Sequence, residues 1–203
     1  MEIINNDEGI KKFNLNLNFQ KFKVCLMGID NSGKSTFLNR IDSINNFKKF
    51  KESIKVYTPT DGVSFFSIFI KYKGKLFHLD VWDCSGQERY SALVSYFQYN
   101  ALAILNFYDP FNKKSFELIK KNLEILKELN NKYLCCYIII KSKCDLNETK
   151  DRNIMISDEE VLEFADKNNL LFRNLSNLEK YGSGIEEIIE DIINTYLHKN
   201  NKN

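Results

Sequence analysis

The residues whose types and spacing point most directly to chemistry run from Gly28 to Ser35 and read Gly-Ile-Asp-Asn-Ser-Gly-Lys-Ser. They fit the pattern G-x-x-x-x-G-K-[ST] of a loop that binds phosphate. Glycines let the backbone wrap closely around a phosphate, and the loop N–H groups and the N-terminus of a following helix point at the anion. Lys34 is then expected to bridge the β- and γ-phosphates of a nucleotide, and Ser35 to bind Mg²⁺.

The motif alone does not separate ATP from GTP. Its candidate nucleotide-binding residues are Gly28, Asp30, Asn31, Ser32, Gly33, Lys34, Ser35 and Thr36.

A second segment, from Leu79 to Tyr90, reads L-D-V-W-D-C-S-G-Q-E-R-Y. It resembles the W-D-T-A-G-Q-E-R-[FY] segment of the Rab branch of the Ras-like small GTPases. The resemblance implies that Asp83 holds Mg²⁺ through a water molecule and that the N–H of Gly86 approaches the γ-phosphate. Gln87 would then orient the attacking water, which is the role of the corresponding glutamine in Ras and Gα.

Between these segments, Thr58 to Phe66 read T-P-T-D-G-V-S-F-F. This resembles the first switch of Rab proteins, where P/S-T-I-G-V-x-F carries the threonine that completes the coordination of Mg²⁺. The resemblance gives that role to Thr60, with Thr58 as the weaker candidate. The preceding stretch, 47–57, contains four lysines and is typical of a solvated loop. Its aromatic residues Phe47 and Phe50 are the candidates for packing on a guanine ring.

A third segment, Ser142-Lys143-Cys144-Asp145-Leu146, resembles the N-K-C-D-L segment that reads guanine in this family. Asp145 would accept hydrogen bonds from the ring N1–H and the exocyclic amine, and the aliphatic stem of Lys143 would lie on the ring face. Ser142 replaces the asparagine and cannot make a two-ended amide bridge. We therefore expect weaker nucleotide binding, with the guanine preference kept by Asp145.

A further base-pocket candidate is the stretch Ser176-Asn177-Leu178, which takes the place of the family's S-A-K. Only the serine of that motif matches. Taken together, the motifs and the resemblance imply two sets of functional residues. The catalytic residues would be Lys34, Thr60 and Gln87, and the magnesium ligands would be Ser35, Thr60 and Asp83.

Alternating apolar and amphipathic segments must position these motifs. Short apolar runs predict buried strands, and apolar residues at helical spacing predict helices between them. The expected strands are 22–27, 64–72, 76–82, 101–108, 133–140 and 170–175, with a tight turn at Lys73-Gly74. The expected helices follow the phosphate loop through Phe37 and Ile41 and then cover 113–129, 157–167 and 184–197.

This alternation predicts an α/β fold with a mostly parallel sheet and helices on both faces. With the resemblance, it implies a P-loop NTPase G domain of three α/β/α layers, with a six-stranded sheet and one antiparallel strand. We expect an N-terminal extension at 1–20, the G domain at 21–197 and a polar tail at 198–203.

In the extension, Phe13, Leu15, Leu17 and Phe19 alternate with polar residues. The stretch is either a partly ordered extension or an added edge strand or partner-binding segment, and a bulge or turn near Gln20–Lys21 would explain the change of parity before Phe22.

The bulk composition excludes several classes of protein. A formal net charge of +2 does not indicate a nucleic-acid binder. The five cysteines have no C-x-x-C spacing and accompany only two histidines, so we expect buried free thiols in a reducing compartment and no zinc site. No apolar run is long enough for a membrane span. Glu2 and the ending HKNNKN predict neither N-myristoylation nor C-terminal prenylation, so we expect no direct lipid anchor and a cytoplasmic protein that partners recruit to membranes.

Three functions are compatible with these motifs. The first is a switch that binds and slowly hydrolyses GTP, with intracellular or vesicle trafficking as the expected setting. The second is a nucleotide-bound Rab-like subunit of a transport or scaffold complex with little turnover, which Asp30 and Ser142 favour because both depart from the Ras pattern. The third is a P-loop enzyme that uses ATP, which the Asp145 motif argues against.

The resemblance also implies protein partners. Effectors would bind through Phe65, Trp82, Phe97 and the switch loops, and an exchange factor and a GTPase-activating protein are expected. The alternative for the three aromatic residues is an ordinary place in the core.

Overall fold

The computed structural model describes residues 2–4, 20–44, 62–86, 94–128, 136–144, 155–176 and 184–200. The strands are β1 (Glu2–Ile4), β2 (Gln20–Met27), β3 (Val63–Tyr72), β4 (Lys75–Cys84), β5 (Ala103–Tyr108), β6 (Cys136–Lys141) and β7 (Leu171–Asn174). The helices are α2 (Lys34–Ile44), α3 (Val94–Gln98), α4 (Lys113–Glu128), α5 (Asp158–Asn168) and α6 (Ile185–Asn200).

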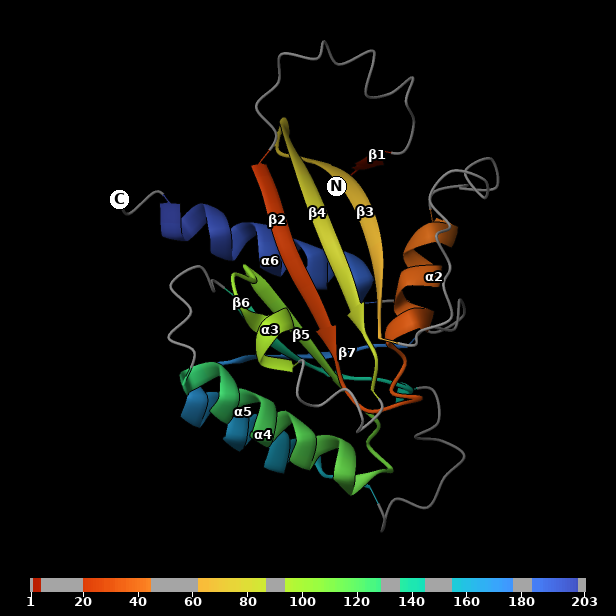
Figure 1. Ribbon diagram of the computed structural model, residues 1–203, viewed down its shortest axis with the longest axis vertical. Helices are drawn as coiled ribbons and strands as arrows, with labels where there is room; N and C mark the ends of the chain where they lie inside the picture. Colours follow the sequence, from red (N-terminus) through yellow and green to blue (C-terminus); the bar gives the residue numbers. More distant parts are fainter. Residues whose placement is uncertain are drawn as a thin grey trace.

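All seven strands form one twisted sheet in the order β1-β3-β4-β2-β5-β6-β7 (Figure 1). Strands β4, β2, β5, β6 and β7 are parallel neighbours, and β3 is antiparallel to β4. The predicted six-stranded sheet with one antiparallel strand is therefore confirmed. The short strand β1 adds to its edge, antiparallel to β3, with Ile3 opposite Ile70.

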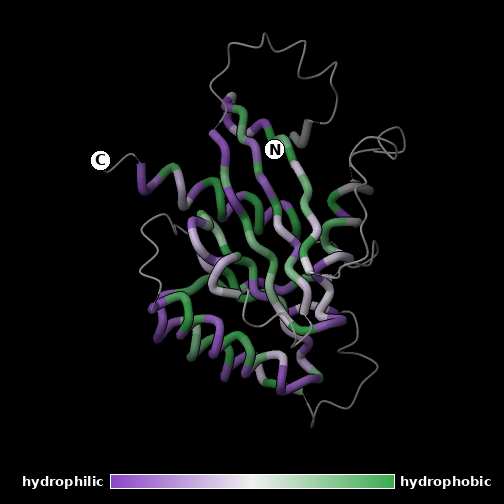
Figure 2. Tube along the Cα trace, viewed as in Figure 1, coloured by the Kyte–Doolittle hydropathy of each residue, from purple (hydrophilic) through white to green (hydrophobic). Residues whose placement is uncertain are grey.

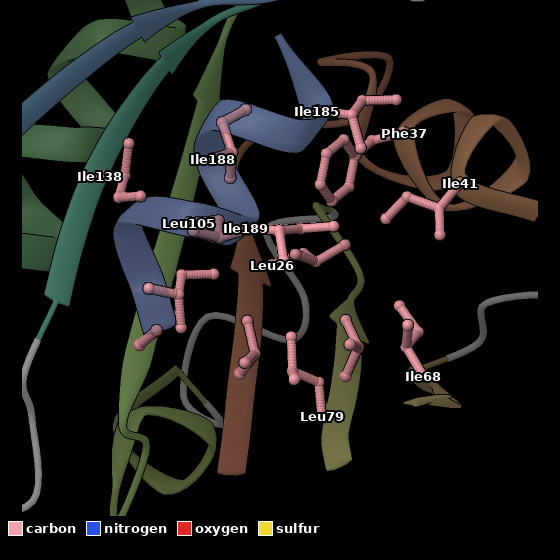
Figure 3. Close-up of a cluster of buried hydrophobic side chains, with 14 of the residues drawn as sticks. Leu26, Phe37, Ile41, Ile68, Leu79, Leu105, Ile138, Ile185, Ile188 and Ile189 are labelled. Carbon is pink, nitrogen blue, oxygen red and sulfur yellow. The ribbon is translucent and has the colours of Figure 1, made fainter. Parts of the chain in front are cut away.

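The two faces of the sheet have separate cores. On one face, Phe37 and Ile41 of α2 and the isoleucines of α6 pack on strand residues such as Leu26 and Leu79, as Figure 3 shows. On the other face, α3, α4 and α5 pack on residues such as Met27 and Ile104. In Figure 2, hydrophobic and hydrophilic residues alternate along α4 and α5, as expected of helices with one buried face.

Local sequence signals explain several boundaries. Lys73 and Gly74 have φ angles of 48° and 74°, so the two-residue turn between β3 and β4 has the positive φ at both positions that its hairpin twist requires. The side chain of Ser157 accepts a hydrogen bond from the N–H of Glu160 and caps α5. The sequence predicted the tight turn and a helix beginning at residue 157, and the structure supplies the φ angles and the cap.

Other expectations need correction or extension. Gln20 and Lys21 pair in continuous register with Phe77 and His78, so the expected bulge or turn is not at these residues. The alternating stretch 13–19 lies outside the described residues. Helix α6 continues to Asn200, so the first residues of the expected polar tail are helical.

A polar network crosses the core between α3, α4, β5 and β6. The Gln98 side-chain amide, from α3, donates to the carbonyl of Asn122 at 3.2 Å. The Asn122 amide donates to Asn106 at 3.3 Å, and the Asn106 amide donates to the hydroxyl of Tyr137 at 2.6 Å. All four residues are buried. Burial raises the pKa of Tyr137, so its hydroxyl stays neutral. The network therefore ties the end of α3 to the strand that leads to the third motif.

Of the cysteines that the structure describes, Cys25, Cys84 and Cys136 are buried free thiols and Cys144 is partly exposed. None of the helices in the described ranges has both the length and the hydrophobicity needed to cross a bilayer.

Candidate functional site

The phosphate loop joins the carboxyl end of β2 to the N-terminus of α2, as the motif requires. Gly28 has a φ of 140°, and a Cβ there would lie 2.4 Å from the carbonyl oxygen of Phe107. Only glycine fits this close approach to β5. Asn31 and Gly33 also have positive φ angles, 62° and 94°, so the backbone curls before the helix begins. The result is a tight loop that opens directly onto a helix N-terminus.

Lys34 lies within this loop. Its ammonium donates hydrogen bonds of 2.9 Å to the carbonyls of Gly28 and Ile29, and the side chain is almost fully buried. Burial lowers the pKa of Lys34, and the charges of Asp83 and Asp30 oppose that shift. The partners of the ammonium are therefore neutral carbonyl oxygens of the loop. Charged phosphate oxygens would bind the ammonium more strongly than these carbonyls do.

The two described magnesium-ligand candidates are in contact. The hydroxyl of Ser35 donates a 2.6 Å hydrogen bond to Oδ2 of Asp83, which lies near the end of β4. Oδ1 of Asp83 is buried and has no hydrogen-bond partner among the described residues. Burial raises the pKa of Asp83, while the Ser35 bond and the Lys34 charge lower it. A hydroxyl and an unsatisfied carboxylate oxygen form a donor set that fits Mg²⁺.

The described parts of the two segments that resemble Rab motifs, 58–66 and 79–90, meet beside the phosphate loop. The N–H of Ser85 donates to the carbonyl of Gly62 at 2.9 Å, where β3 begins opposite the end of β4. A Cβ on Gly86 would lie 2.2 Å from the carbonyl carbon of Ile29 and 2.3 Å from the nitrogen of Asp30. Gly86 therefore brings the second segment into direct contact with the backbone of the phosphate loop.

The third motif follows β6, and its backbone is fixed on both sides. The N–H and the hydroxyl of Ser142 both donate to the carbonyl of Tyr108, at 2.9 and 2.7 Å, and Ser142 is fully buried. The N–H of Cys144 donates to the carbonyl of Leu175 at 3.4 Å. Because Leu175 precedes Ser176, this contact places the third motif next to Ser176, the first residue of the further base-pocket candidate.

Lys143 lies between these two anchors. Its φ is 58°, and its ammonium pairs with Oδ2 of Asp109 at 2.7 Å. Asp109 is not among the residues predicted from the sequence motifs. It directly follows the apolar run 101–108, and a carboxylate at the carboxyl end of a parallel strand is a signal that would have identified it.

Several predicted residues lie outside the described part of the chain: Phe47, Phe50, Thr58, Thr60, Gln87, Asp145, Asn177 and Leu178. Lys34 is therefore the one predicted catalytic residue that can be placed. Asp30, Asn31 and Thr36 are exposed on the loop and the first turn of α2, Ser32 is buried, and Ser176 is buried beside the third motif.

The predicted aromatic patch forms on the face of the sheet that carries α3. The rings of Phe65 and Trp82 meet edge-on at 5.7 Å, and those of Trp82 and Phe97 lie 6.3 Å apart. Phe65 is 45% exposed, whereas Phe97 is 8% exposed and belongs to the core. The core alternative therefore holds for Phe97, while the exposed side chain of Phe65 remains the candidate contact for effectors. Tyr96 and Tyr99, on and just after α3, are also exposed.

A loop that closes on a lysine next to a serine–aspartate pair, at the carboxyl edge of a parallel sheet, defines a P-loop nucleotide-binding protein. Within that class the chain belongs to the Ras family, whose family model matches residues 23–198.

Known relatives refine this assignment. The chain is 33% identical to Ras-related protein RABA1h of Arabidopsis thaliana, over 78% of this chain and 67% of that protein. It is 30% identical to Ras-related protein RABA1a of the same plant, over 88% and 76%. It is 33% identical to Ras-related protein Rab-4 of Dictyostelium discoideum, over 87% and 80%. The protein is therefore a divergent, Rab-like small GTPase of the Ras superfamily.

Proposed function

We propose that this protein is a guanine-nucleotide switch that binds GDP and GTP with Mg²⁺ and hydrolyses GTP slowly without an activating partner. The observation that carries the proposal is the contact between Ser35 and Asp83 beside the loop that holds Lys34. This arrangement brings a hydroxyl, a carboxylate and an ammonium together where a β,γ-phosphate and its metal ion would lie.

In the proposed reaction, each residue has a separate task. Lys34 exchanges its carbonyl partners for phosphate oxygens and balances charge that develops between the β- and γ-phosphates. Gln87 orients the attacking water, and Thr60 and Ser35 bind the metal directly. Asp83 acts on the metal through a water molecule. When bound, Mg²⁺ supplies positive charge that stabilises the leaving phosphate oxygens.

Guanine selectivity is proposed to come from Asp145, with the stem of Lys143 against the ring. The hydroxyl of Ser142 already bonds the carbonyl of Tyr108, so this residue supports the base site by fixing the backbone. A base site built on buried hydrogen bonds rejects adenine strongly, because adenine would leave the carboxylate of Asp145 unpaired.

The two switch segments are proposed to report the nucleotide to effectors. They meet at Gly62 and Ser85, so an order–disorder change in either loop reaches the start of β3 and the end of β4. The exposed edge of Phe65 and the neighbouring Trp82 offer effectors an aromatic contact. The proposed setting is intracellular or vesicle trafficking, with partners recruiting the protein to membranes.

A second candidate is a nucleotide-bound subunit with little turnover. Asp30 supports it, because this exposed carboxylate lies in the phosphate loop and adds negative charge near the γ-phosphate. Such a charge repels the phosphate and crowds an incoming arginine finger.

The nucleotide content of the purified protein tests both candidates. The protein is denatured, the released nucleotide is identified by chromatography, and GTP hydrolysis is followed in a single turnover with and without Mg²⁺. A switch releases GDP or GTP and hydrolyses GTP, and Gln87→Leu slows that hydrolysis. Tight guanine binding without turnover, unchanged by Gln87→Leu, would favour the passive subunit. Failure to bind added GTP would refute both.

A further inference from the structure

Lys143 and Asp109 come from neighbouring strand ends. Asp109 directly follows β5, and Lys143 lies two residues after β6, in a sheet where Tyr108 and Lys141 are register partners. Their side chains pair at 2.7 Å across 34 residues of sequence. The pair therefore spans the edge of the sheet at which the proposed nucleotide site lies.

The carboxylate of Asp109 is held in place independently of Lys143. Its Oδ1 accepts a 2.9 Å hydrogen bond from the N–H of Phe111. Its backbone N–H donates to the hydroxyl of Ser115 at 3.1 Å, and that hydroxyl donates back to the Asp109 carbonyl at 3.0 Å. The side chain is only 13% exposed. Asp109 therefore has a fixed position in the connection between β5 and α4, where its carboxylate can hold the end of a long, flexible side chain.

Lys143 is correspondingly fixed at both ends. Its neighbours Ser142 and Cys144 are anchored to Tyr108 and Leu175, and its ammonium is held by Asp109. A lysine side chain that is free at its end occupies many rotamers, whereas one fixed at both ends keeps its aliphatic stem in a single extended direction. The left-handed backbone at Lys143 sets that direction.

We propose that Asp109 is a positioning residue for guanine-nucleotide binding, which holds the stem of Lys143 extended as a surface for the purine ring. The proposal rests on the proposed function, since it assigns a support to the same base site. Asp109 does not touch the nucleotide and acts through Lys143 alone. Its second oxygen bonds Phe111, so the ammonium can be released from the pair without disturbing the loop.

The test compares variants of the full-length protein by the dissociation rate of a fluorescent GDP and by competition with GDP and IDP. Asp109→Asn keeps an acceptor for Phe111 but loses the charge that holds Lys143. We expect it to speed GDP dissociation by about tenfold, in the range of residues coupled by direct contact. The affinity of Asp109→Asn for IDP, which lacks the exocyclic amine, should fall by the same factor as its affinity for GDP. Asp109→Glu keeps the charge and should retain most of the wild-type affinity for both nucleotides.

The matched control is Asp191→Asn. It breaks the Arg173–Asp191 ion pair, whose side chains are 33% and 21% exposed against 32% and 13% for Lys143–Asp109, and which links β7 to α6. A similar change in dissociation rate in this control would show a general loss of rigidity and would overturn the proposal.

A double-mutant cycle gives the decisive comparison. In a Lys143→Met background, Asp109→Asn should have no further effect on dissociation, because its route of action has been removed. Additive effects, or a changed ratio of GDP to IDP affinity, would show that Asp109 acts elsewhere and would overturn the proposal.

An unchanged rate of GDP dissociation in Asp109→Asn, with a wild type that binds GDP, would refute this inference alone. A wild type that binds neither nucleotide would refute the proposed function and this inference with it.

Discussion

The hydroxyl of Ser35 and the carboxylate of Asp83, 48 residues apart in the sequence, meet in a 2.6 Å hydrogen bond. Ser35 lies in the first turn of α2 and Asp83 near the end of β4. The contact therefore joins the first and second motifs at the carboxyl ends of the parallel strands. The same bond supports the ionised form of a carboxylate that burial otherwise disfavours.

The first prediction concerns this pair. Asp83→Asn removes the charge that would hold Mg²⁺ through water, and we expect the Mg²⁺ concentration needed for tight nucleotide binding to rise by about 10- to 100-fold, as for other outer-shell metal partners. The measurement is nucleotide dissociation across a magnesium titration. Asp80→Asn is the control, because Asp80 lies on the same strand but pairs with Lys21. An equal effect in both variants would contradict the assignment.

The second prediction separates backbone strain from backbone contact. Gly86→Ala places a methyl group against the phosphate loop backbone, so the second segment must move away and nucleotide affinity should fall sharply. Gly74→Ala places its methyl group in open space at a φ of 74° and should cost about 1–2 kcal/mol of stability, the usual cost of an L residue in the left-handed region, without changing nucleotide affinity. Calorimetric titration with GDP and denaturant unfolding test both variants. Normal GDP binding by Gly86→Ala would argue against the close contact.

The third prediction compares how much two residues of the aromatic patch, Phe97 and Phe65, contribute to the free energy of unfolding. Phe97 is buried among core residues, so Phe97→Ala should lower the free energy of unfolding by about 3–5 kcal/mol. Phe65 is 45% exposed, and Phe65→Ala should cost about 1 kcal/mol or less, with GDP affinity unchanged. Denaturant unfolding measures both free energies. Equal costs would mean that Phe65 is a core residue and would remove the structural reason for assigning it to effectors.

The fourth prediction is a pH dependence at the far end of the sheet. His78 stacks on Phe69, contacts the hydroxyl of Ser67 at 3.1 Å and faces Asp80, which Lys21 also pairs with. Burial lowers the pKa of His78 below its ordinary value of 6.5; the charge of Asp80 opposes this shift, and that of Lys21 adds to it. The unfolded chain therefore binds more protons than the folded protein just below pH 6.5, and stability is lost as the pH falls through the folded pKa.

Thermal unfolding from about pH 7.5 to about pH 5 measures this effect. The wild type should lose more stability over that range than His78→Gln, which keeps a hydrogen-bonding group but does not titrate. The difference should be small, because the ring keeps some contact with water. Parallel curves for the two proteins would contradict the prediction.

The sequence predicted an element most reliably where its pattern of apolar residues or turn residues was compatible with only one type of secondary structure. Continuous apolar runs predicted β5 and β6, and the Lys73-Gly74 pair between two strand-like runs predicted the hairpin, whose positive φ angles the structure shows. Strand β1 was not predicted, because three residues are too few for a period to be detected. Its pairing partner, β3, is distant in the sequence, and only the tertiary fold brings them together.

Of the residues that the motifs predicted, Lys34, Ser35, Asp83 and Gly86 are described and lie together at the phosphate loop, but the motifs did not predict how each side chain points. The weaker base contact expected from Ser142 stays a prediction, and the structure adds a bond from the Ser142 hydroxyl to the carbonyl of Tyr108 that the motif did not indicate. Asp109 belongs to no motif, so its pairing with Lys143 becomes visible only when the ends of β5 and β6 are adjacent in space.

The buried network from Gln98 to Tyr137 has a mechanical consequence. These hydrogen bonds join buried side chains, so sliding α3 past α4 would leave buried donors and acceptors unpaired, which costs free energy. Small displacements are resisted, and larger ones require several partners to change at once. A shift of α3 relative to α4 therefore has to break the bond between Gln98 and Asn122, which couples the position of α3 to the helix packed beside it.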